Sequence, residues 1–423
     1  MKEILPFFRA LLCVFLFIPA SNVFAQRSLT LAEAERSLQE NNLFLLAAQY
    51  EIPAAEAAVI QARIWDLPQA TAGLNLINPQ DKRVFDVGRN GQKEVEVQQI
   101  IYLGGKKKRE VAFAKSNVTI ARLQFEQLLR NLRLQLRQSF YTLYYDRQRL
   151  QRTDEQIRIL NTLLTAYQTQ TDKGNVPLKE LVRLEALVLN LRTNRADLAR
   201  EILESQRILS LLTGTTETIT PVITEARPAE RIPFPFLNRD SAIAYALENN
   251  LEYQTAQRIA ESSELRLRWQ RTLAVPDLTA GLSYDQNSGA FRNEVNLTLG
   301  IPIPLWNRNR GNIKEAEARL SQSRYERDYR RTELVTLAGT QYDLWQQQRA
   351  QLRNLRPETV ANLDAVYRGT ITNFQKRNIS LLEFTDFVES YNNAVNQLSE
   401  IQKAALLSGL SLENTLNVNL DSK

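Results

Sequence analysis

The side chains of this 423-residue chain that could do chemistry are carboxylates, amines and hydroxyls, because the sequence has no histidine and one cysteine. The lack of histidine excludes Ser-His-Asp and Cys-His catalysis, imidazole metal ligands and a histidine pH switch. Cys13 lies in an apolar N-terminal segment, so thiol, Fe–S and zinc-finger chemistry are not expected in the rest of the chain. Gly104-Gly105-Lys106 lacks the spacing of a phosphate-binding loop. We therefore expect neither an enzyme nor a bound cofactor or metal.

Composition points to long helices and away from nucleic acid. The chain has 53 basic and 47 acidic residues, and the two signs alternate along it. There is no basic domain with interleaved aromatic residues, so a nucleic-acid partner is not expected. Glycine and proline are scarce, at 14 each. Few helix-breaking residues over this length favour long helices.

The N-terminus has the pattern of an export signal. Lys2 and Arg9 flank the start, residues 10–18 form an apolar core, and residues 23–25, Val-Phe-Ala, resemble a cleavage site. The core is shorter than the roughly 20 residues that span a bilayer as a helix. We expect residues 1–25 to be a signal peptide and no later segment to be a transmembrane helix.

The mature sequence is a tandem repeat. Residues 40–43 and 248–251 are both Glu-Asn-Asn-Leu, and at the same offset residues 71–74 and 279–282 are both Thr-Ala-Gly-Leu. Two copies of one unit therefore organise the chain. A proline-rich segment between them reads as a linker. The expected divisions are repeat one at 26–218, the linker at 219–236 and repeat two at 237–423.

Each repeat is expected to contain very long helices. Residues 106–173 have no glycine or proline and would reach about 100 Å if wholly helical. After a turn at 174–177, apolar residues recur at heptad spacing and are interrupted only by Arg195 and Ser205. Such spacing is typical of a coiled-coil seam. In repeat two, Pro357 is expected to kink or break the matching helix.

Apolar and polar residues alternate between the helices, which predicts β-strands. Each predicted strand is near the 9–11 residues of a transmembrane β-strand. Four strands cannot close a barrel, since the smallest membrane barrels have about eight and an open edge in lipid leaves backbone groups unpaired. Insertion in a membrane would therefore require several chains to share one barrel. The strands are expected at 69–77, 94–103, 277–285 and 292–303.

Aromatic and basic residues follow the predicted strands. Tyr102 and Trp306 lie where an aromatic belt would meet the membrane surface. Basic residues come next in both repeats, and they are expected either to contact anionic lipid headgroups or to be solvated helix starts. These residues are Lys106, Lys107, Arg308 and Arg310.

The whole mature sequence resembles the outer membrane factor family of Gram-negative bacteria, the TolC-like efflux ducts. The resemblance rests on the order of short motifs in the two copies, and the strand-end motifs are most similar to the heavy-metal-cation branch. The motifs are Leu29-Thr30-Leu31-Ala32-Glu33-Ala34, Leu103-Gly104-Gly105-Lys106, Ile301-Pro302-Ile303-Pro304-Leu305 and Asn378-Ile379-Ser380-Leu381-Leu382-Glu383.

This resemblance implies a mainly α fold with a membrane β-hairpin pair. Three protomers would each give four strands to one twelve-stranded outer-membrane barrel, and their helices would continue it as an α-barrel across the periplasm. The implied partners are two further copies, outer-membrane lipid, a periplasmic adaptor and an inner-membrane pump. The implied function is a duct that passes heavy-metal cations or drugs to the exterior.

The resemblance also implies sites at the periplasmic tip. Glu383 and Asp386, one helical turn apart, match the acidic ring that narrows the tip in such families. Three-fold symmetry would give six carboxylates, which would attract cations and gate the pore. The alternative is two solvated helix carboxylates. Adaptor contact is expected at two turns, at Lys173, Gly174, Asn175, Arg377 and Asn378.

Two other functions fit the same sequence. A protein-secretion duct has the same fold. A soluble periplasmic coiled-coil adaptor or structural protein would share the helices, but it would neither reside in the outer membrane nor form a trimer stable in detergent. No motif specifies the exported substrate, the adaptor or the pump.

Overall fold

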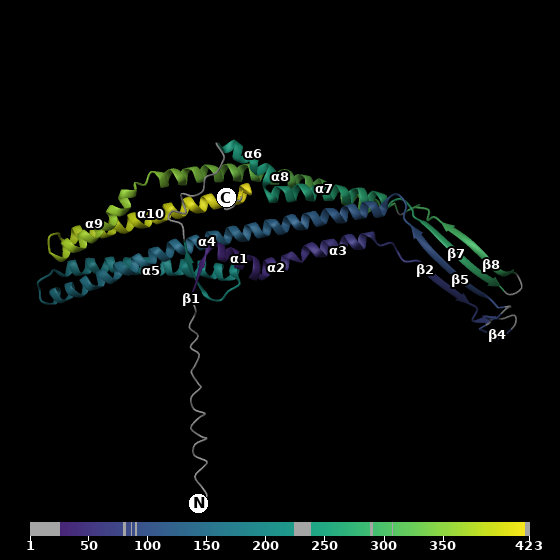
Figure 1. Ribbon diagram of the computed structural model, residues 1–423, viewed down its shortest axis with the longest axis horizontal. Coiled ribbons are helices and arrows are strands. Elements are labelled where there is room, and N and C mark those ends of the chain that lie inside the picture. Colours follow the sequence, from purple (N-terminus) through teal and green to yellow (C-terminus); the bar gives the residue numbers. More distant parts are fainter. Residues whose placement is uncertain are drawn as a thin grey trace, which may run out of the picture. The chain divides into compact units, whose positions relative to one another are not determined.

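The computed structural model is dominated by helices, with strands inserted between them (Figure 1). The predicted signal peptide and most of the predicted linker lie outside the part of the chain that it describes. The described residues are 26–78, 82–85, 87–88, 91–223, 238–287, 291–306 and 308–418.

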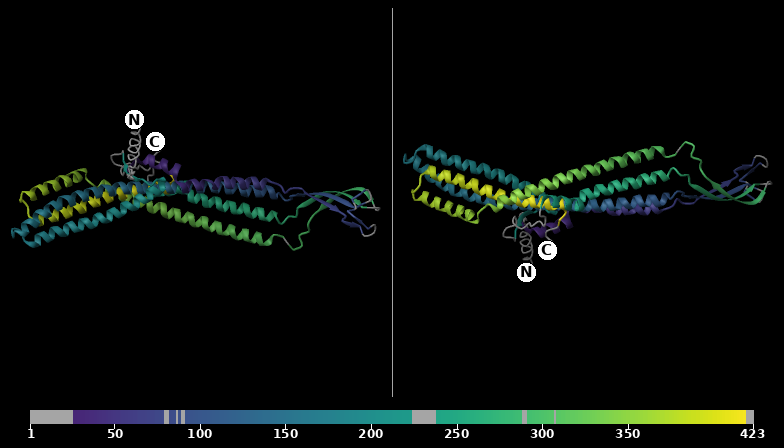
Figure 2. Two further views of the ribbon diagram at one scale, coloured as in Figure 1. Left: turned by 90° about the horizontal axis from the view of Figure 1, so that it is seen from below. Right: turned by 90° about the horizontal axis from the view of Figure 1, so that it is seen from above.

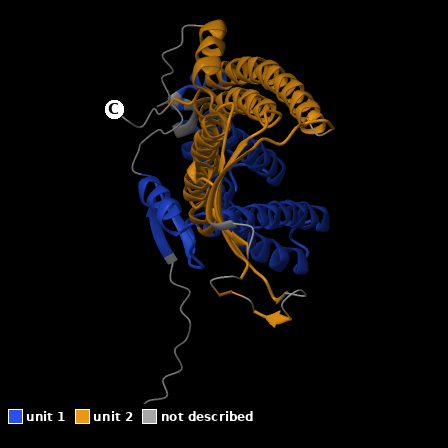
Figure 3. Ribbon diagram, turned by 90° about the vertical axis from the view of Figure 1, so that its right-hand side faces the viewer, with its two compact units in different colours: residues 1–42, 135–231, 351–407 blue, residues 43–134, 232–350, 408–423 orange. Residues whose placement is uncertain are grey.

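The chain forms two compact units, and each takes segments from both repeats (Figure 3). The repeats of the sequence are therefore not the compact units of the fold. Unit 1 comprises residues 1–42, 135–231 and 351–407, and unit 2 comprises residues 43–134, 232–350 and 408–423.

The longest helix, α4, runs over Lys106–Asp172 and has 67 residues, which confirms the helix predicted from the absence of glycine and proline. At 1.5 Å per residue it is about 100 Å long. Helix α5 follows the turn after α4, and helix α10 follows the corresponding turn of repeat two. The two helices have 36 residues each. Their bounds are Leu178–Thr213 and Leu381–Leu416. The shorter helices are α1 (Leu31–Asn41), α2 (Leu43–Gln49), α3 (Glu51–Arg63), α6 (Arg239–Asn249) and α7 (Leu251–Thr272).

Pro357 breaks the long helix of repeat two, as predicted. Helix α8 covers Arg310–Arg353, and α9 begins at Pro357 and ends at Gln375. A proline in a helix interior removes a hydrogen bond and clashes with the preceding turn, whereas its fixed φ suits the first turn of a helix. The proline therefore starts a new helix in place of continuing the old one.

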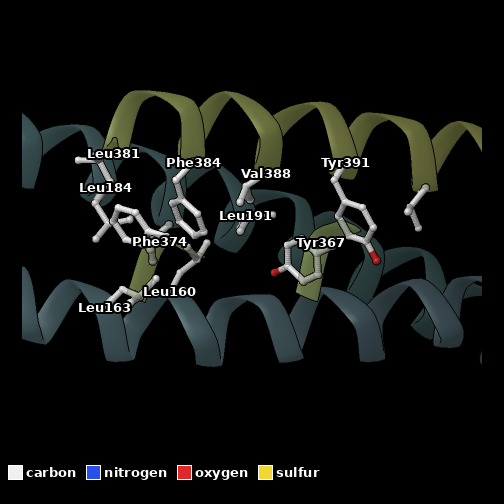
Figure 4. Packing of buried hydrophobic residues seen from close by; sticks show 12 residues of the cluster. Leu160, Leu163, Leu184, Leu191, Tyr367, Phe374, Leu381, Phe384, Val388 and Tyr391 are labelled. Atoms are coloured by element: carbon white, nitrogen blue, oxygen red, sulfur yellow. The ribbon is translucent and has the colours of Figure 1, made fainter. Parts of the chain in front are cut away.

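The core of unit 1 is built by α4, α5, α9 and α10. Phe384 is fully buried and stacks on Phe374, with ring centroids 4.3 Å apart (Figure 4). Most of the predicted seam on α5 is buried, which confirms the heptad reading. Members of this cluster include Leu160, Leu163, Leu184, Val188, Leu191, Tyr367, Leu381, Val388 and Tyr391.

The repeated Glu-Asn-Asn-Leu motif has a capping role in both copies. The side-chain Nδ2 of Asn42 donates to the carbonyl of Leu212, at 3.1 Å, near the end of α5. The Nδ2 of Asn250 donates to the carbonyl of Thr415, at 3.0 Å, near the end of α10. The last carbonyls of a helix have no partner within it, so these amides satisfy groups that would otherwise be unpaired. The motif is thus identical in the two copies because both need an asparagine amide to pair with the last carbonyls of a neighbouring helix.

The four predicted strands form one antiparallel sheet with the order β2-β5-β7-β8. Their ends differ from the prediction by a few residues, at β2 (Gln69–Leu74), β5 (Lys93–Ile101), β7 (Leu278–Asn287) and β8 (Phe291–Gly300). Between β2 and β5, a small hairpin is formed by β3 (Ile77–Asn78) and β4 (Arg83–Val84).

A second, unpredicted strand pair lies in unit 1. Strand β1 (Gln26–Thr30) pairs in parallel with β6 (Thr218–Val222). The first residues of the predicted linker therefore belong to β6. The rest of the predicted linker, from residue 224, lies outside the described residues.

One helical segment departs from the expectation that no later segment could span a membrane. By length and composition alone, Leu43–Arg63 is apolar enough to do so, although α2 and α3 divide it. Its side chains are mostly exposed, with Leu43 at 80 % and Phe44 at 64 %. Apolar surface of this kind marks a place where another surface is expected to pack.

Candidate functional site

One face of the four-stranded sheet is apolar and exposed. The strand register brings apolar residues of the two repeats into shared rows across it. In these rows Leu282 is 57 % exposed and Leu297 is 72 % exposed. A soluble protein would bury an apolar face of this kind, whereas here the face is exposed in the single chain. The rows are Ala70-Val97-Leu282-Leu297 and Ala72-Val95-Tyr284-Val295.

The opposite face of the sheet is polar and acidic. Ser283 on this face is buried, whereas its apolar neighbours on the other face are exposed. Glu94, Asp285 and Glu294 stand directly opposite one another on three adjacent strands. None of the three forms an ion pair within the described residues. Like charges placed opposite each other destabilise a sheet, so this row breaks a local rule in the way that functional positions do.

Lys106 departs from the prediction of headgroup contact. Its ammonium lies 2.6 Å from the Oδ2 of Asp277, and the residue is 6 % exposed. The other carboxylate oxygen of Asp277 accepts a hydrogen bond from the backbone N–H of Leu103 at 3.0 Å. A buried ammonium needs a charged partner, so the ion pair of Lys106 with Asp277 links the start of α4 to the start of β7. The Lys106 ammonium is therefore not available to bind a lipid headgroup.

The remaining predicted interface residues lie near the same end of the sheet. Tyr102 contacts Trp65, with centroids 5.5 Å apart, and its hydroxyl bonds to Asp66, which raises the pKa of Tyr102 to about 12. Lys107 lies over the Tyr102 ring and pairs with Glu110 at 3.0 Å. This group is an internally bonded aromatic cluster.

The repeat-two members of the interface set are more exposed. Trp306 is 89 % exposed. Arg308 is exposed, and its Nε donates to the carbonyl of Pro304 at 3.1 Å. Arg310 is exposed and begins α8. These side chains are free to meet a surface that accepts an indole ring and positive charge.

The two predicted adaptor turns lie at the same end of unit 1 (Figures 1 and 2). In the first, the N–H of Asn175 donates to the carbonyl of Gln170 at 2.9 Å. In the second, the N–H of Asn378 donates to the carbonyl of Asn373, also at 2.9 Å. Both therefore end their helices with the same motif, which requires a left-handed residue. Gly174 supplies it with a φ of 74°, and Arg377 supplies it with a φ of 61°.

Glu383 and Asp386 are both exposed, but their environments differ. The Oε2 of Glu383 accepts hydrogen bonds from the N–H and the hydroxyl of Ser380, each at 2.8 Å. These bonds hold the pKa of Glu383 below its ordinary value. Asp386 makes no hydrogen bond or ion pair with any other described residue. Of the two, only Asp386 has an uncommitted carboxylate.

Sequence reasoning missed Asp277, Asp66 and the acidic row. Asp277 and Asp66 gave no periodic or motif signal, because their partners are far along the chain or in the adjacent loop. The acidic row could have been approached from the strand alternation, which marks Glu94 and Glu294 as polar-face positions. Its assembly depends on the register between β5 and β7, which joins the two repeats.

Residues 35–215 and 242–418 match the family described as "Outer membrane efflux protein". This covers both repeats and most of the chain. The chain belongs to the outer membrane efflux protein family. This efflux protein is accordingly an outer-membrane channel component of a tripartite efflux system, which confirms the resemblance and decides against a soluble periplasmic adaptor. The protein-secretion alternative stays a prediction.

Two curated relatives of this efflux protein are metal-resistance proteins. The cobalt-zinc-cadmium resistance protein CzcC of Cupriavidus metallidurans is 20 % identical over 363 residues, covering 85 % of this chain and 82 % of CzcC. The nickel-cobalt-cadmium resistance protein NccC of Alcaligenes xylosoxydans xylosoxydans is 25 % identical over 325 residues, covering 74 % of this chain and 68 % of NccC. The relatives belong to the branch that the sequence motifs indicated.

Solved structures show the same fold. CusC matches with a TM-score of 0.72 at 17 % identity, covering 92 % of each chain. The CmeC outer membrane channel of Campylobacter jejuni matches with a TM-score of 0.74 at 12 % identity, covering 93 % of this chain and 87 % of CmeC. The mainly α fold with its hairpin pair is therefore confirmed.

Proposed function

We propose that three copies of this efflux protein close one twelve-stranded outer-membrane barrel and form the duct of a heavy-metal-cation efflux system with a periplasmic adaptor and an inner-membrane pump. The observation that carries the proposal is a sheet with an exposed apolar face and two free edges. Within the described residues, β2 and β8 each pair with one strand only. In lipid, unpaired backbone groups cost several kcal/mol each, so these edges need partners.

Strand direction supports closure by further copies of the same chain. All three pairings in the sheet are antiparallel, so β2 and β8 run in opposite directions. The β8 edge of one copy can then pair antiparallel with the β2 edge of the next. Four strands per chain give twelve in a trimer, an even number like those of bacterial outer-membrane barrels.

Exposed apolar stripes on the helices also favour contact between copies. On α5, apolar residues opposite the buried seam recur at roughly heptad spacing and are between 51 % and 69 % exposed. A second heptad stripe on a helix is what an additional helical neighbour would require. The residues are Val182, Leu189, Leu203 and Leu211.

A cation cargo is supported by the charge of the polar sheet face. In a barrel whose apolar face meets lipid, the acidic row of Glu94, Asp285 and Glu294 would line the lumen. A lumen lined with carboxylates favours cations over anions. The resistance named for CzcC and NccC is to metals that include cobalt and cadmium, which form cations.

For the tip we propose two roles. Asp386 and Glu383 form the acidic constriction, with Asp386 the more available carboxylate. The turns that contain Lys173, Gly174 and Asn175 and those of Arg377 and Asn378 contact the adaptor. Their exposure and their position at one end of unit 1 support this assignment.

At the membrane surface we propose that Trp306, Arg308 and Arg310 contact outer-membrane lipid. The 89 % exposure of Trp306 supports this role. Tyr102 and Lys107 are proposed to support that interface through their aromatic cluster. Lys106 is not proposed to contact lipid, because it pairs with Asp277.

The decisive measurement is the mass of the particle extracted from outer membranes in mild detergent. Three chains per particle are expected. Leu297→Arg, on the apolar face, should abolish the membrane trimer, because an arginine at mid-bilayer costs about 2–4 kcal/mol. Asn296→Arg, the adjacent polar-face position, is the matched control and should still assemble. A monomer in the periplasmic fraction, or equal effects of both variants, would contradict the shared barrel.

A further inference from the structure

The helices of unit 2 that lead into and out of the sheet are two copies of one packed pair. In repeat one α3 packs on the start of α4, and in repeat two α7 packs on the start of α8. Helix α3 is therefore equivalent to α7, and the start of α4 is equivalent to the start of α8. The two apolar clusters match along the repeat, with Val59 equivalent to Leu267, Val111 to Ile313, Ala114 to Ala316 and Val118 to Leu320.

The two pairs are joined within the chain by contact between α4 and α7. The hydroxyl of Ser116 on α4 donates to the hydroxyl of Ser262 on α7 at 2.8 Å. Phe113 of α4 stacks on Trp269 of α7, with ring centroids 5.8 Å apart. The helices thus lie in the order α3-α4-α7-α8 (Figures 1 and 2). In this row α4 and α7 each have a helix on both sides, whereas α3 and the start of α8 are its two ends.

The two ends of the row carry the small side chains that a further joint of the same kind would need. The position equivalent to Ser116 is Ala318 on α8, and the position equivalent to Ser262 is Ala54 on α3. Both alanines are exposed in the single chain. The distance between two packed helices depends on the side chains at their contact, so a pair of alanines permits an approach as close as that of the two serines.

A second pair of equivalent positions brings exposed apolar side chains together. Gln127 of α4 and Leu251 at the start of α7 border one cavity of about 60 Å³, so they lie at the same level of the α4–α7 contact. The equivalent of Gln127 is Tyr329 on α8, and the equivalent of Leu251 is Leu43 at the start of α2. Tyr329 is 63 % exposed and Leu43 is 80 % exposed. One contact would remove both side chains from water, which is favourable.

We propose that α8 of one copy packs on α2 and α3 of the next copy in the way that α4 packs on α7 within one chain. Ala318 then crosses Ala54 of the next copy, and Tyr329 covers Leu43 of the next copy. The contact joins two different surfaces of the chain, so each copy can use one surface on either side, and such contacts close into a ring.

The apolar segment Leu43–Arg63 is covered by protein in this arrangement, and not by lipid. Lipid is the poorer occupant, because Glu51 and Glu56 lie on α3 and the hydrocarbon core of a membrane excludes carboxylates. The inference rests on the proposed barrel, since only an assembly of copies supplies the next chain. It adds the helices that meet and the residues at their crossing, which strand pairing alone does not specify.

The test is cysteine cross-linking of the full chain in outer membranes. The only native cysteine, Cys13, lies in the predicted signal peptide. After oxidation, Ala54→Cys with Ala318→Cys is expected to give disulfide-linked dimers and trimers, because the equivalent hydroxyls are 2.8 Å apart and a disulfide needs Cβ atoms about 3.5–4.5 Å apart. Electrophoresis without reductant measures the products.

Two further cysteine pairs are the controls. Ser116→Cys with Ser262→Cys should form a disulfide within one chain and leave its mass that of a monomer. Ala54→Cys with Tyr325→Cys should not cross-link, because Tyr325 lies about two helical turns, roughly 10 Å, beyond Ala318. Each single cysteine variant should likewise remain without a cross-link.

The outcomes separate this packing from the barrel. A trimer of the expected mass that does not cross-link through Ala54→Cys and Ala318→Cys, while the serine-derived pair oxidises, would overturn the packing and leave the barrel proposal intact. Equal cross-linking of the Tyr325→Cys pair would also overturn it. A chain that stays monomeric would overturn both proposals.

Charge substitutions at the second contact give an independent measurement. Leu43→Asp and Tyr329→Lys should each lower the fraction of trimer in mild detergent severalfold, and the two together should restore it, because opposite charges then face each other. Both side chains are exposed in the single chain, so its folding should be unaffected. Leu43→Lys with Tyr329→Lys is the matched control and should not recover. Unchanged trimer in both single variants, or equal recovery in the like-charged pair, would overturn the proposal.

Discussion

The turn that joins α4 to α5 and the turn that joins α9 to α10 have the same backbone hydrogen bonds but different residues at the left-handed position. Gly174 takes this conformation in repeat one and Arg377 takes it in repeat two. For a residue other than glycine, the left-handed region costs about 1–2 kcal/mol. Repeat two therefore accepts backbone strain and gains an exposed guanidinium, and strain of this kind clusters at functional positions.

The helix starts after the two turns differ in the same direction. Pro177 caps α5 without a side-chain hydrogen bond. In repeat two, Ser380 and Glu383 form a reciprocal cap at the start of α10. Leu178 is 64 % exposed, whereas Leu381 at the equivalent position is 5 % exposed. In repeat two, the helix after the strained turn is therefore held by a cap and by the buried Leu381 side chain. In repeat one, the corresponding helix start exposes the apolar side chain of Leu178.

The largest expected difference is between Leu381→Ala and Leu178→Ala. Removing the buried Leu381 side chain should lower the free energy of unfolding by about 2–5 kcal/mol. Leu178→Ala should change it by less than about 0.5 kcal/mol. Urea or thermal unfolding of the detergent-solubilised chain measures both. If both variants lost stability equally, the starts of α5 and α10 would not differ in how firmly they are packed.

Exchanging the left-handed residues should reverse the strain. Arg377→Gly should raise stability by about 1 kcal/mol, and Gly174→Arg should lower it by a similar amount. Melting temperatures of the two variants test this. Arg377→Gly should at the same time weaken adaptor binding in a pull-down assay, if the guanidinium is the reason for the strain. A destabilised Arg377→Gly variant would contradict the strain argument.

Glu383→Gln should show a smaller effect that depends on pH. The folded-state pKa of Glu383 lies below its ordinary value of 4.5, so the ionised carboxylate stabilises the folded chain above about that pH. The stability is lost as pH falls through the folded value. The wild-type chain should therefore melt above the variant at pH 7, and the gap should close below pH 4.5. Glu180→Gln is the control, because among the described residues no serine forms a capping hydrogen bond with the Glu180 side chain.

Asp386→Asn is expected to leave the melting temperature unchanged, because the carboxylate has no partner in the described chain. Its effect should appear in single-channel recordings, as reduced preference for cations over anions or raised basal conductance, and more strongly when combined with Glu383→Gln. Unchanged recordings for the double variant would rule out the acidic constriction while leaving the fold untouched.

Local patterns in the sequence predicted the long helices and the four-stranded sheet. The absence of glycine and proline between Gly105 and Gly174 predicted α4 to within one residue. Alternation predicted the four strands of the sheet to within a few residues. The pair β1 and β6 was not predicted, because each strand has five residues and its partner is far along the chain. Short strands carry too little periodicity to be recognised without their partners.

The sequence by itself determined the long helices, the helix break at Pro357 and the four strands of the sheet, since helix-breaking residues and periodicity act over a few residues. Only the tertiary structure decided which charges are free. Lys106 is bound by Asp277, which is 171 residues away, while Glu94, Asp285 and Glu294 meet without an ion-pair partner among the described residues. A charge is neutralised by whatever lies within a few ångströms of it, and that neighbour is chosen by strand register and helix packing between distant segments.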